Sequence, residues 1–259
     1  MVAIYEPKGA AKEYAELACN LYGDADGKVG GCQHGCKYCY CPQFLHIPAE
    51  RFYCIPKPKP RIIESLERAA NKMMANGDKR RVAFGFIGDP YCQVEMDYGV
   101  TRQALQVMVD RGVLFEIITK GGTRAVRDFD LLKQGGRLGI SLVWDDSFKA
   151  IEWEPDAAGI DDRVIALWNA HNEGIYTWVS VEPVIEPQEA LNAIRWVTKA
   201  TDEFRVGKIN HCKELEQRVD WQKFTDEAYE LLLQTGRAFM FKDSLHPYLQ
   251  GRPAKVGYE

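Results

Sequence analysis

The stretch GGCQHGCKYCYCP (residues 30–42) holds four of the chain's eight cysteines within thirteen residues. Cys32, Cys36 and Cys39 follow a C-x3-C-x2-C spacing, and Cys41 comes two residues later. The N-terminal sequence is too polar for a signal peptide, so we expect a cytoplasmic protein whose thiols stay reduced. Clustered cysteines in that compartment bind a metal or take part in chemistry more often than they form disulfides.

Two kinds of metal centre can use thiols at this spacing. Four cysteines can hold a structural zinc ion, but such sites usually combine two separated C-x2-4-C pairs, and no second pair occurs in this chain. Three thiolates from one loop suit a cubane iron–sulfur cluster in which the fourth iron stays open to another ligand. An open metal position is typical of a catalytic site. The spacing therefore favours a catalytic iron–sulfur centre, and a zinc site with Cys41 as the fourth ligand is the alternative.

The chain behind this loop alternates short apolar segments with segments of helical periodicity. Strands are expected at residues 81–88, 113–119, 138–144, 176–185, 204–210 and 238–242. Helices are expected between them, within residues 62–74, 98–111, 126–132 and 164–168, from about residue 188, and within residues 224–232. Such alternation predicts βαβ units around a parallel sheet, either closed as a barrel or open and doubly wound.

Polar or charged residues follow each of these expected strands. They lie in GDPYC (88–92), TKGG (119–122), SLVWDD (141–146), VEPVIEP (181–187), KINHC (208–212) and KDS (242–244). The carboxyl ends of parallel strands meet at one edge of the sheet, where ligands and catalytic groups gather in α/β folds. The pattern therefore predicts one shared pocket at that edge.

The composition is that of an ordinary globular protein. The 259 residues include 33 Lys and Arg and 37 Asp and Glu, which gives a net charge of −4. Nucleic-acid-binding proteins usually carry a basic balance, so the charge does not indicate a large DNA or RNA target, although a local basic patch is compatible with it. No apolar run reaches the roughly 18 residues of a membrane span. We expect a single domain over residues 1–259 that interacts with no membrane.

The segment GCQHGCKYCY (31–40) resembles the signature of the radical S-adenosylmethionine superfamily, with an aromatic residue, Tyr38, directly before the third cysteine. The segments GDPYCQVEMDYGVTRQAL (88–105) and EIITKGG (116–122) are most similar to the branch that contains spore photoproduct lyase. The resemblance covers about residues 28–245 and implies an α/β fold. That fold is a partial (βα)6 TIM-type barrel with parallel strands, in which the cluster loop follows the first strand.

The resemblance also implies cofactors and a reaction. Cys32, Cys36 and Cys39 would hold a [4Fe-4S] cluster whose open iron binds S-adenosylmethionine. A low-potential electron donor of flavodoxin or ferredoxin type would drive cleavage of this cofactor to methionine and a 5′-deoxyadenosyl radical. The radical would abstract a hydrogen atom from an organic substrate, such as a nucleotide or another nucleic-acid component. The alternative is a non-catalytic zinc or iron–sulfur module that acts as a scaffold or an electron carrier.

Roles for individual residues follow from their positions in this resemblance. Tyr38 would pack against the adenine or the cluster. Gly88 and Asp89 would contact the ammonium group of the cofactor, with an Asp where the superfamily usually has a Glu. Lys120 would pair with the carboxylate of the cofactor, and Ser141 would bind its ribose.

Further strand-end residues are expected near the substrate. Glu182 ends an otherwise apolar strand, so its carboxylate should point into the pocket and meet ribose or substrate. Substrate contacts are also predicted for Lys208, Asn210, Lys242 and Asp243. Cys92 lies at a strand end and is a candidate hydrogen-atom donor to a product radical, as a cysteine is in spore photoproduct lyase. The position of that lyase's own cysteine aligns with Phe86 or Ile87, so a strict lyase assignment is not supported, and His34 is expected to fix the cysteine loop.

Overall fold

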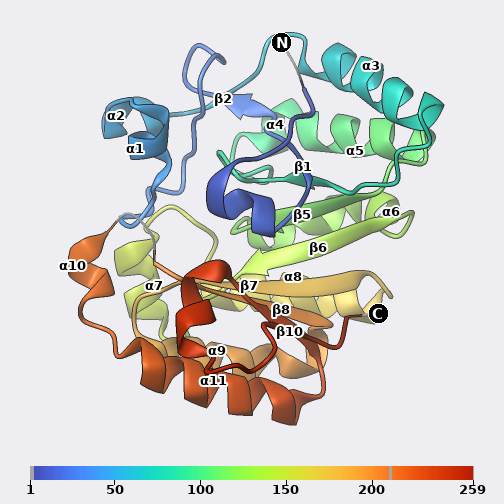
Figure 1. Cartoon of the computed structure of the whole chain (residues 1–259). Coiled ribbons are helices and arrows are strands. Elements are labelled where there is room, and N and C mark those ends of the chain that lie inside the picture. The colour runs from blue at the N-terminus through green and yellow to red at the C-terminus, as the bar shows by residue number, and fades with distance from the viewer. Residues whose placement is uncertain (1–2, 210–211, 259) are drawn as a thin grey trace.

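A curved sheet of eight strands organises the chain, which a computed structural model describes over residues 3–209 and 212–258 (Figure 1). Neighbouring strands run parallel from β1 to β9, and β10 is antiparallel to β9. The strands are β1 (Leu17–Cys19), β4 (Val82–Phe84), β5 (Phe115–Thr119), β6 (Gly136–Ser141), β7 (Tyr176–Val184), β8 (Glu203–Lys208), β9 (Ala238–Phe241) and β10 (Lys255–Val256). A separate small sheet pairs β2 (Tyr22–Gly23) with β3 (Lys57–Pro58). Within the described residues, β1 and β10 are the two edge strands of this sheet and do not pair with each other, so the barrel is partial.

Helices connect successive parallel strands and lie on the outside of the sheet (Figure 1). The connecting helices are α3 (Ile62–Ala75), α5 (Val100–Asp110), α6 (Phe129–Leu132), α8 (Ile160–Asn172), α9 (Pro187–Val197) and α11 (Trp221–Thr235). The shorter helices are α1 (Cys41–Leu45), α2 (Ala49–Phe52), α4 (Glu95–Tyr98), α7 (Ser147–Trp153) and α10 (Lys213–Glu216), with 3-10 turns η1 (Gly9–Glu13), η2 (Gly122–Asp128), η3 (Thr198–Ala200) and η4 (Asp243–Tyr248). In the part of the chain that the structure describes, no helix combines the length and apolar character needed to span a membrane. The partial TIM-type barrel expected from the sequence is confirmed.

The strand expected at residues 81–88 ends early, because β4 stops at Phe84. Gly85 (φ +118°) and Gly88 (φ +83°) follow it in backbone conformations that side chains rarely allow. A Cβ atom on Gly85 would also lie 2.2 Å from the Ile118 carbonyl oxygen. The chain therefore turns across the end of the sheet here instead of extending the strand.

The helix expected at residues 126–132 is divided between η2 and α6 at Asp128. This side chain is fully buried, and its carboxylate accepts hydrogen bonds from Tyr91 at 3.0 Å, Arg102 at 3.1 Å and Arg127 at 2.8 Å. A buried charged group at this point interrupts the apolar face that the sequence suggested.

The first residues of the chain cross the open side of the barrel, and we call residues 5–14 the N-terminal strap. At its start, Tyr5 forms an antiparallel bridge with Ala18 of β1, with N–O distances of 3.0 and 2.8 Å. At its end, the Glu13 carboxylate accepts a hydrogen bond of 2.6 Å from the N–H of Asp243, which follows β9. Figure 1 shows this segment, in dark blue, in front of the sheet. The strap thereby links the first parallel strand to the last.

Candidate active site

A cavity of about 610 Å³ opens at the carboxyl ends of the parallel strands. It is lined by ten of the residues predicted for the site: Cys32, Cys36, Tyr38, Cys39, Gly88, Asp89, Lys120, Ser141, Glu182 and Lys242. Apolar side chains that include Phe86, Ile118 and Ile209 form much of the remaining wall. The strand ends therefore contribute to one pocket, as the alternation of strands and helices predicted.

The cysteine loop (residues 30–41) is seated by close backbone packing. A Cβ atom on Gly31 would lie 2.5 Å from the carbonyl oxygen of Gly23. A Cβ atom on Gly88 would lie 2.5 Å from the carbonyl oxygen of Gly31. A side chain at either glycine would push the loop outward, so both positions require glycine for the loop to reach its place.

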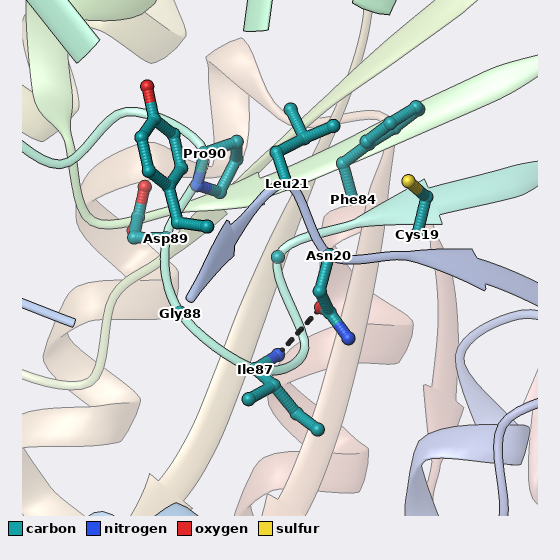
Figure 2. A pocket seen from close by; sticks show the side chains of 10 residues that line it. Cys19, Asn20, Leu21, Phe84, Ile87, Gly88, Asp89 and Pro90 are labelled. Atoms are coloured by element: carbon teal, nitrogen blue, oxygen red, sulfur yellow. Dashed lines mark hydrogen bonds between the residues drawn. The ribbon is translucent and has the colours of Figure 1, made fainter. Parts of the chain in front are cut away.

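Asn20, which follows β1, fixes the turn after β4 from the other side (Figure 2). Its Oδ1 accepts a hydrogen bond of 2.9 Å from the N–H of Ile87, and its Nδ2 donates one of 2.6 Å to the Tyr5 hydroxyl. Figure 2 shows Asn20 and Ile87 facing each other beside Gly88 and Asp89. One amide side chain therefore connects the strap, the end of β1 and the turn that borders the cavity.

The Asp89 carboxylate joins the cysteine loop to the ends of β4 and β5. Its Oδ1 accepts hydrogen bonds from the Thr119 hydroxyl at 2.6 Å and the Tyr91 N–H at 2.7 Å. Its Oδ2 accepts one from the Lys120 N–H at 2.7 Å and lies 2.9 Å from His34 Nε2. Burial alone would raise the pKa of this carboxyl, but His34 and the hydrogen bonds hold it well below its usual range. Asp89 therefore acts as a clamp on the loop, and its contact with a cofactor ammonium group stays a prediction.

Glu154, at the end of α7, organises the charges beside Tyr38. It is fully buried, it accepts a hydrogen bond from the Tyr38 hydroxyl, and Oε2 lies 2.6 Å from an Arg163 nitrogen. Lys120 Nζ lies 3.8 Å from Glu154 Oε1 and 5.6 Å from the centre of the Tyr38 ring. Burial opposes the charge on both Glu154 and Lys120. The positive charges of Arg163 and Lys120 nevertheless lower the pKa of Glu154, and the negative charge of Glu154 raises the pKa of Lys120. Lys120 therefore presents a positive charge to the cavity.

A second polar group lies at the end of β7. Lys242 Nζ lies 2.9 and 3.1 Å from the two Glu182 carboxylate oxygens and 4.4 Å from the centre of the Tyr14 ring. The Tyr14 hydroxyl donates to Glu182 and lies 2.8 Å from Ser180 Oγ. Burial and the neighbouring Glu182 raise the pKa of Tyr14, so the phenol stays protonated. A Cβ atom on Gly207 would lie 2.8 Å from the Glu182 side chain, so this glycine leaves room for the ion pair.

The prediction that Cys92 faces the pocket is wrong. Its side chain is fully buried in the hydrophobic core, and it is not among the residues that line the cavity. After Asp89 the chain forms successive turns, with the Cys92 N–H bonded to the Asp89 carbonyl and the Glu95 N–H to the Cys92 carbonyl. These turns direct the thiol inward. Cys41 does line the cavity, with Sγ 3.7 Å from the Phe86 carbonyl oxygen.

The predicted substrate contacts at the ends of β8 and β9 are mostly outside the cavity. Lys208 Nζ lies 2.6 Å from Glu216, and Ile209 rather than Lys208 lines the cavity. Asn210 lies outside the described residues. The Asp243 side chain is 77% exposed and does not line the cavity. The prediction for Lys208 is therefore wrong, because the neighbouring residue Ile209 faces the cavity instead. Among the described residues at these positions, only Lys242 borders the cavity.

Several lining residues were missed from the sequence. Ser180 lies two residues before Glu182 on β7, so the alternation of side chains along a strand places both on one face. Ser180 could therefore have been predicted from the prediction for Glu182. Tyr14 and Lys59 also line the cavity, but they belong to segments outside the alternating strands. No local pattern marked those two residues as part of the site.

The sequence pattern that defines the Radical SAM superfamily matches residues 28–187, more than half of the chain. This chain belongs to the radical SAM superfamily. No curated protein matches the sequence. Among solved structures, spore photoproduct lyase complexed with dinucleoside spore photoproduct has a TM-score of 0.69 and 14% identity, over 92% of this chain and 80% of that chain. Streptococcus suis SuiB bound to S-adenosylmethionine has a TM-score of 0.66 and 13% identity, over 91% of this chain and 53% of that chain.

As a member of this superfamily, the protein is an enzyme, and the superfamily uses a [4Fe-4S] cluster and S-adenosylmethionine. No three His, Cys, Asp or Glu side chains within residues 3–209 and 212–258 converge to hold a single metal ion. Three thiols from one loop border the same cavity and are the donors that cluster irons bind. The ammonium of Lys120 and the hydroxyl of Ser141 match a carboxylate and a ribose. The donor chemistry of these residues fits both groups.

Proposed function

We propose that this radical SAM enzyme binds its cluster through Cys32, Cys36 and Cys39 and removes a hydrogen atom from an organic substrate inside the cavity. The observation that carries the proposal is that these thiols and the polar side chains of the strand ends line one cavity of about 610 Å³. Small-molecule sites usually span about 300–1,000 Å³. When bound, the cluster and S-adenosylmethionine supply a 5′-deoxyadenosyl radical.

The residues around the cavity bind and orient the reactants. We propose that Lys120 pairs with the cofactor's carboxylate, Ser141 bonds its ribose, and Tyr38 forms a wall for its adenine. Gly88 leaves room for the Gly31 carbonyl of the cysteine loop, and Asp89 holds that loop in place; we propose that both lie beside the cofactor's ammonium group. The apolar parts of the wall exclude water, which protects a reactive radical from side reactions.

Glu182 and Lys242 are the proposed substrate-facing groups in this arrangement. Both line the cavity, and the ion pair between them orients the two side chains. A nucleotide or another nucleic-acid component is one substrate class, since spore photoproduct lyase is a structural neighbour complexed with a dinucleoside. SuiB, a second neighbour, is solved with its precursor peptide, which makes a peptide the other class to test. A flavodoxin- or ferredoxin-type protein is the proposed electron donor.

Anaerobic reconstitution with iron and sulfide tests the proposal. We expect a brown protein that releases 5′-deoxyadenosine from S-adenosylmethionine when dithionite is added. Cys36→Ala should lose the iron and the release, whereas Cys41→Ala should keep the iron because Cys41 is not a proposed ligand. A colourless protein with stoichiometric zinc, or a Cys36→Ala variant that retains all of its iron, would contradict the proposed centre.

A further inference from the structure

The N-terminal strap forms one wall of the cavity and limits the size of the substrate. Tyr5, residues 7–11 and Tyr14 all line the cavity. The strap is bonded to β1 at one end and to the N–H of Asp243 at the other. Under the proposed function, the cluster, S-adenosylmethionine and the substrate share the volume of about 610 Å³ between the sheet and the strap. A space of this size accepts a small molecule rather than a folded domain or a nucleic-acid duplex.

The charges that line the cavity are not balanced. Two of its four lysines have carboxylate partners: Lys120 pairs with Glu154, and Lys242 pairs with Glu182. The other two are Lys8, which is exposed, and Lys59, which is half-buried. Within residues 3–209 and 212–258, neither has a carboxylate oxygen within 4.0 Å. Two of the four lysines at the cavity wall are therefore not paired with a carboxylate of the described residues.

Lys59 is held beside this cavity by its own backbone. It lies between Pro58 and Pro60, whose rings restrict the chain, and its N–H donates a hydrogen bond of 2.9 Å to the Leu21 carbonyl. Burial lowers the pKa of Lys59, and the nearby Cys19 offsets this only in part. Burial also raises the pKa of Cys19 to about 12, so that thiol is neutral near pH 7 and supplies no counter-charge. A partly buried ammonium group without a counter-charge is unfavourable unless a ligand provides one.

We propose that the substrate is a small organic anion whose phosphate or carboxylate group binds Lys59, with Lys8 attracting it at the rim of the cavity. This assignment rests on the proposed function, because it names the substrate class of the same site. The aliphatic and aromatic side chains that line the cavity suit the uncharged body of such a molecule. A nucleotide belongs to this class, whereas a nucleic-acid duplex is larger than the cavity.

Competition for Lys59 during chemical labelling tests the proposal without the radical reaction. The reconstituted enzyme with bound S-adenosylmethionine is treated with an amine-acetylating reagent, and acetylation of individual lysines is followed by mass spectrometry. Inorganic phosphate, acetate and chloride are compared as probes at equal ionic strength. We expect phosphate or acetate to slow acetylation of Lys59 by at least about threefold relative to chloride, as a charge-assisted contact would. Lys57 is the matched control, since it is exposed and does not line the cavity.

The probes separate the possible sources of the anion. Protection by phosphate alone assigns a phosphate ester, and protection by acetate alone assigns a carboxylate. Equal protection by chloride, or equal protection of Lys57, would mean general screening and would overturn the proposal. Complete protection by S-adenosylmethionine without any probe would overturn it as well, because Lys59 would then bind the cofactor.

Release of 5′-deoxyadenosine provides the second readout. Low-molecular-mass metabolites retained on an anion exchanger should raise the release in wild-type enzyme and in Lys57→Met. They should raise it about tenfold less in Lys59→Met, and Lys59→Arg should recover part of the effect. Equal stimulation of wild type and Lys59→Met would contradict the proposal. Absence of 5′-deoxyadenosine from wild type in every arm would instead contradict the proposed function, and the labelling result would still report on the anion site.

Discussion

Asp89 is the residue whose contacts extend furthest across the site. Its carboxylate is bonded to Thr119, Tyr91 and the Lys120 N–H, and it lies against His34 of the cysteine loop. Asp89→Asn keeps the size of the side chain but removes the charge that faces His34. We expect this variant to unfold more easily by about 1–3 kcal/mol and to lose reconstituted iron faster on gel filtration.

Urea unfolding and iron analysis check this expectation, with Asp97→Asn as the control because Asp97 is exposed on α4. The control should change stability by less than about 0.5 kcal/mol. A normal iron content and stability together with a raised KM for S-adenosylmethionine would show that Asp89 acts on the cofactor alone. That result would contradict the role of Asp89 in holding the cysteine loop and would support its contact with the ammonium group of the cofactor.

Glu154 makes a second prediction at the scale of one side chain. It is fully buried between Arg163, Lys120 and Tyr38, so Glu154→Gln leaves the Arg163 guanidinium buried without a full counter-charge. Removal of one partner of a buried pair typically costs about 3–5 kcal/mol. Glu152→Gln is the matched control, since Glu152 is 67% exposed on the same helix. Chemical unfolding of both variants at pH 7 gives the comparison, and equal small losses would mean that the pair is not stabilising.

The individual residues of the site were predictable where a strand or a motif marked them. Cysteine spacing identified the loop, and strand ends identified Lys120, Ser141 and Glu182 as lining residues. Glu154 and Tyr14 could not be found in this way, because they reach the site from α7 and from the strap. Their positions depend on tertiary packing between distant segments, which local periodicity does not encode.

Alanine substitutions at Gly88, in the loop after β4, and at Gly77, before β4, test whether that loop supports the cysteine loop. Gly88 and Gly77 both have positive φ values, +83° and +66°, so alanine strains the backbone at either position. A Cβ atom at Gly77 meets nothing within 4 Å, whereas one at Gly88 would lie 2.5 Å from the Gly31 carbonyl oxygen. We expect Gly77→Ala to cost about 1 kcal/mol and Gly88→Ala to cost more and to reduce bound iron. Equal losses of stability with normal iron in both variants would show that the cysteine loop does not depend on this contact.

Strand β8 carries a buried charge network whose pH dependence can be derived. Arg205 is 5% exposed and lies 2.6 Å from Glu203 and 2.9 Å from Glu116. Burial would raise the pKa of Glu203, but Arg205 and the hydrogen bonds lower it below its usual value. Because the folded pKa lies below the unfolded one, about 4.3, this stabilisation is complete above that pH and is lost as the pH falls through the folded value.

Arg205→Met should therefore destabilise the protein by about 3–5 kcal/mol at pH 7, because two carboxylates remain buried without their partner. Without Arg205 the pKa of Glu203 rises, so the variant loses less stability than wild type as the pH falls below about 4.5. Urea unfolding over a pH series measures the gap between the two proteins, with the exposed Arg218→Met as the control. A gap that does not narrow at low pH would contradict this account of Glu203.

The elements themselves were predicted well where they are long. The six longer strands after the cysteine loop and most of the connecting helices occur near their expected positions, because apolar periodicity is strong in them. The five residues of η1 and the seven of α7 are too short to show a helical period. On β8 the assigned face was wrong, and the side chain of Ile209 takes the place expected for Lys208.

At the scale of the whole molecule, the strap and the net charge lead to the same expectation for the substrate. The strap closes the open side of the partial barrel, so a long polymer would have to displace it to reach the cavity. The chain carries a net charge of −4, and two lysines that line the cavity, Lys8 and Lys59, have no carboxylate partner among the described residues. Unpaired lysines at a cavity in a chain of negative net charge favour a small anion over an extended phosphate backbone.

Duplex DNA should therefore bind weakly even at low salt, which fluorescence anisotropy of a labelled duplex measures. A protein that contacts Z phosphates of a duplex shows a slope of about −0.9Z in a plot of log K against log salt concentration. For this enzyme we expect a slope between about 0 and −2, because the chain carries a net charge of −4 and the proposed anion site lies at the cavity. The same slope is expected for Lys59→Met, since Lys59 faces the cavity and not an external groove. A steep slope that becomes shallower in Lys59→Met would mean that the N-terminal strap opens to admit a DNA strand. In that case the strap would not limit the substrate to a small molecule.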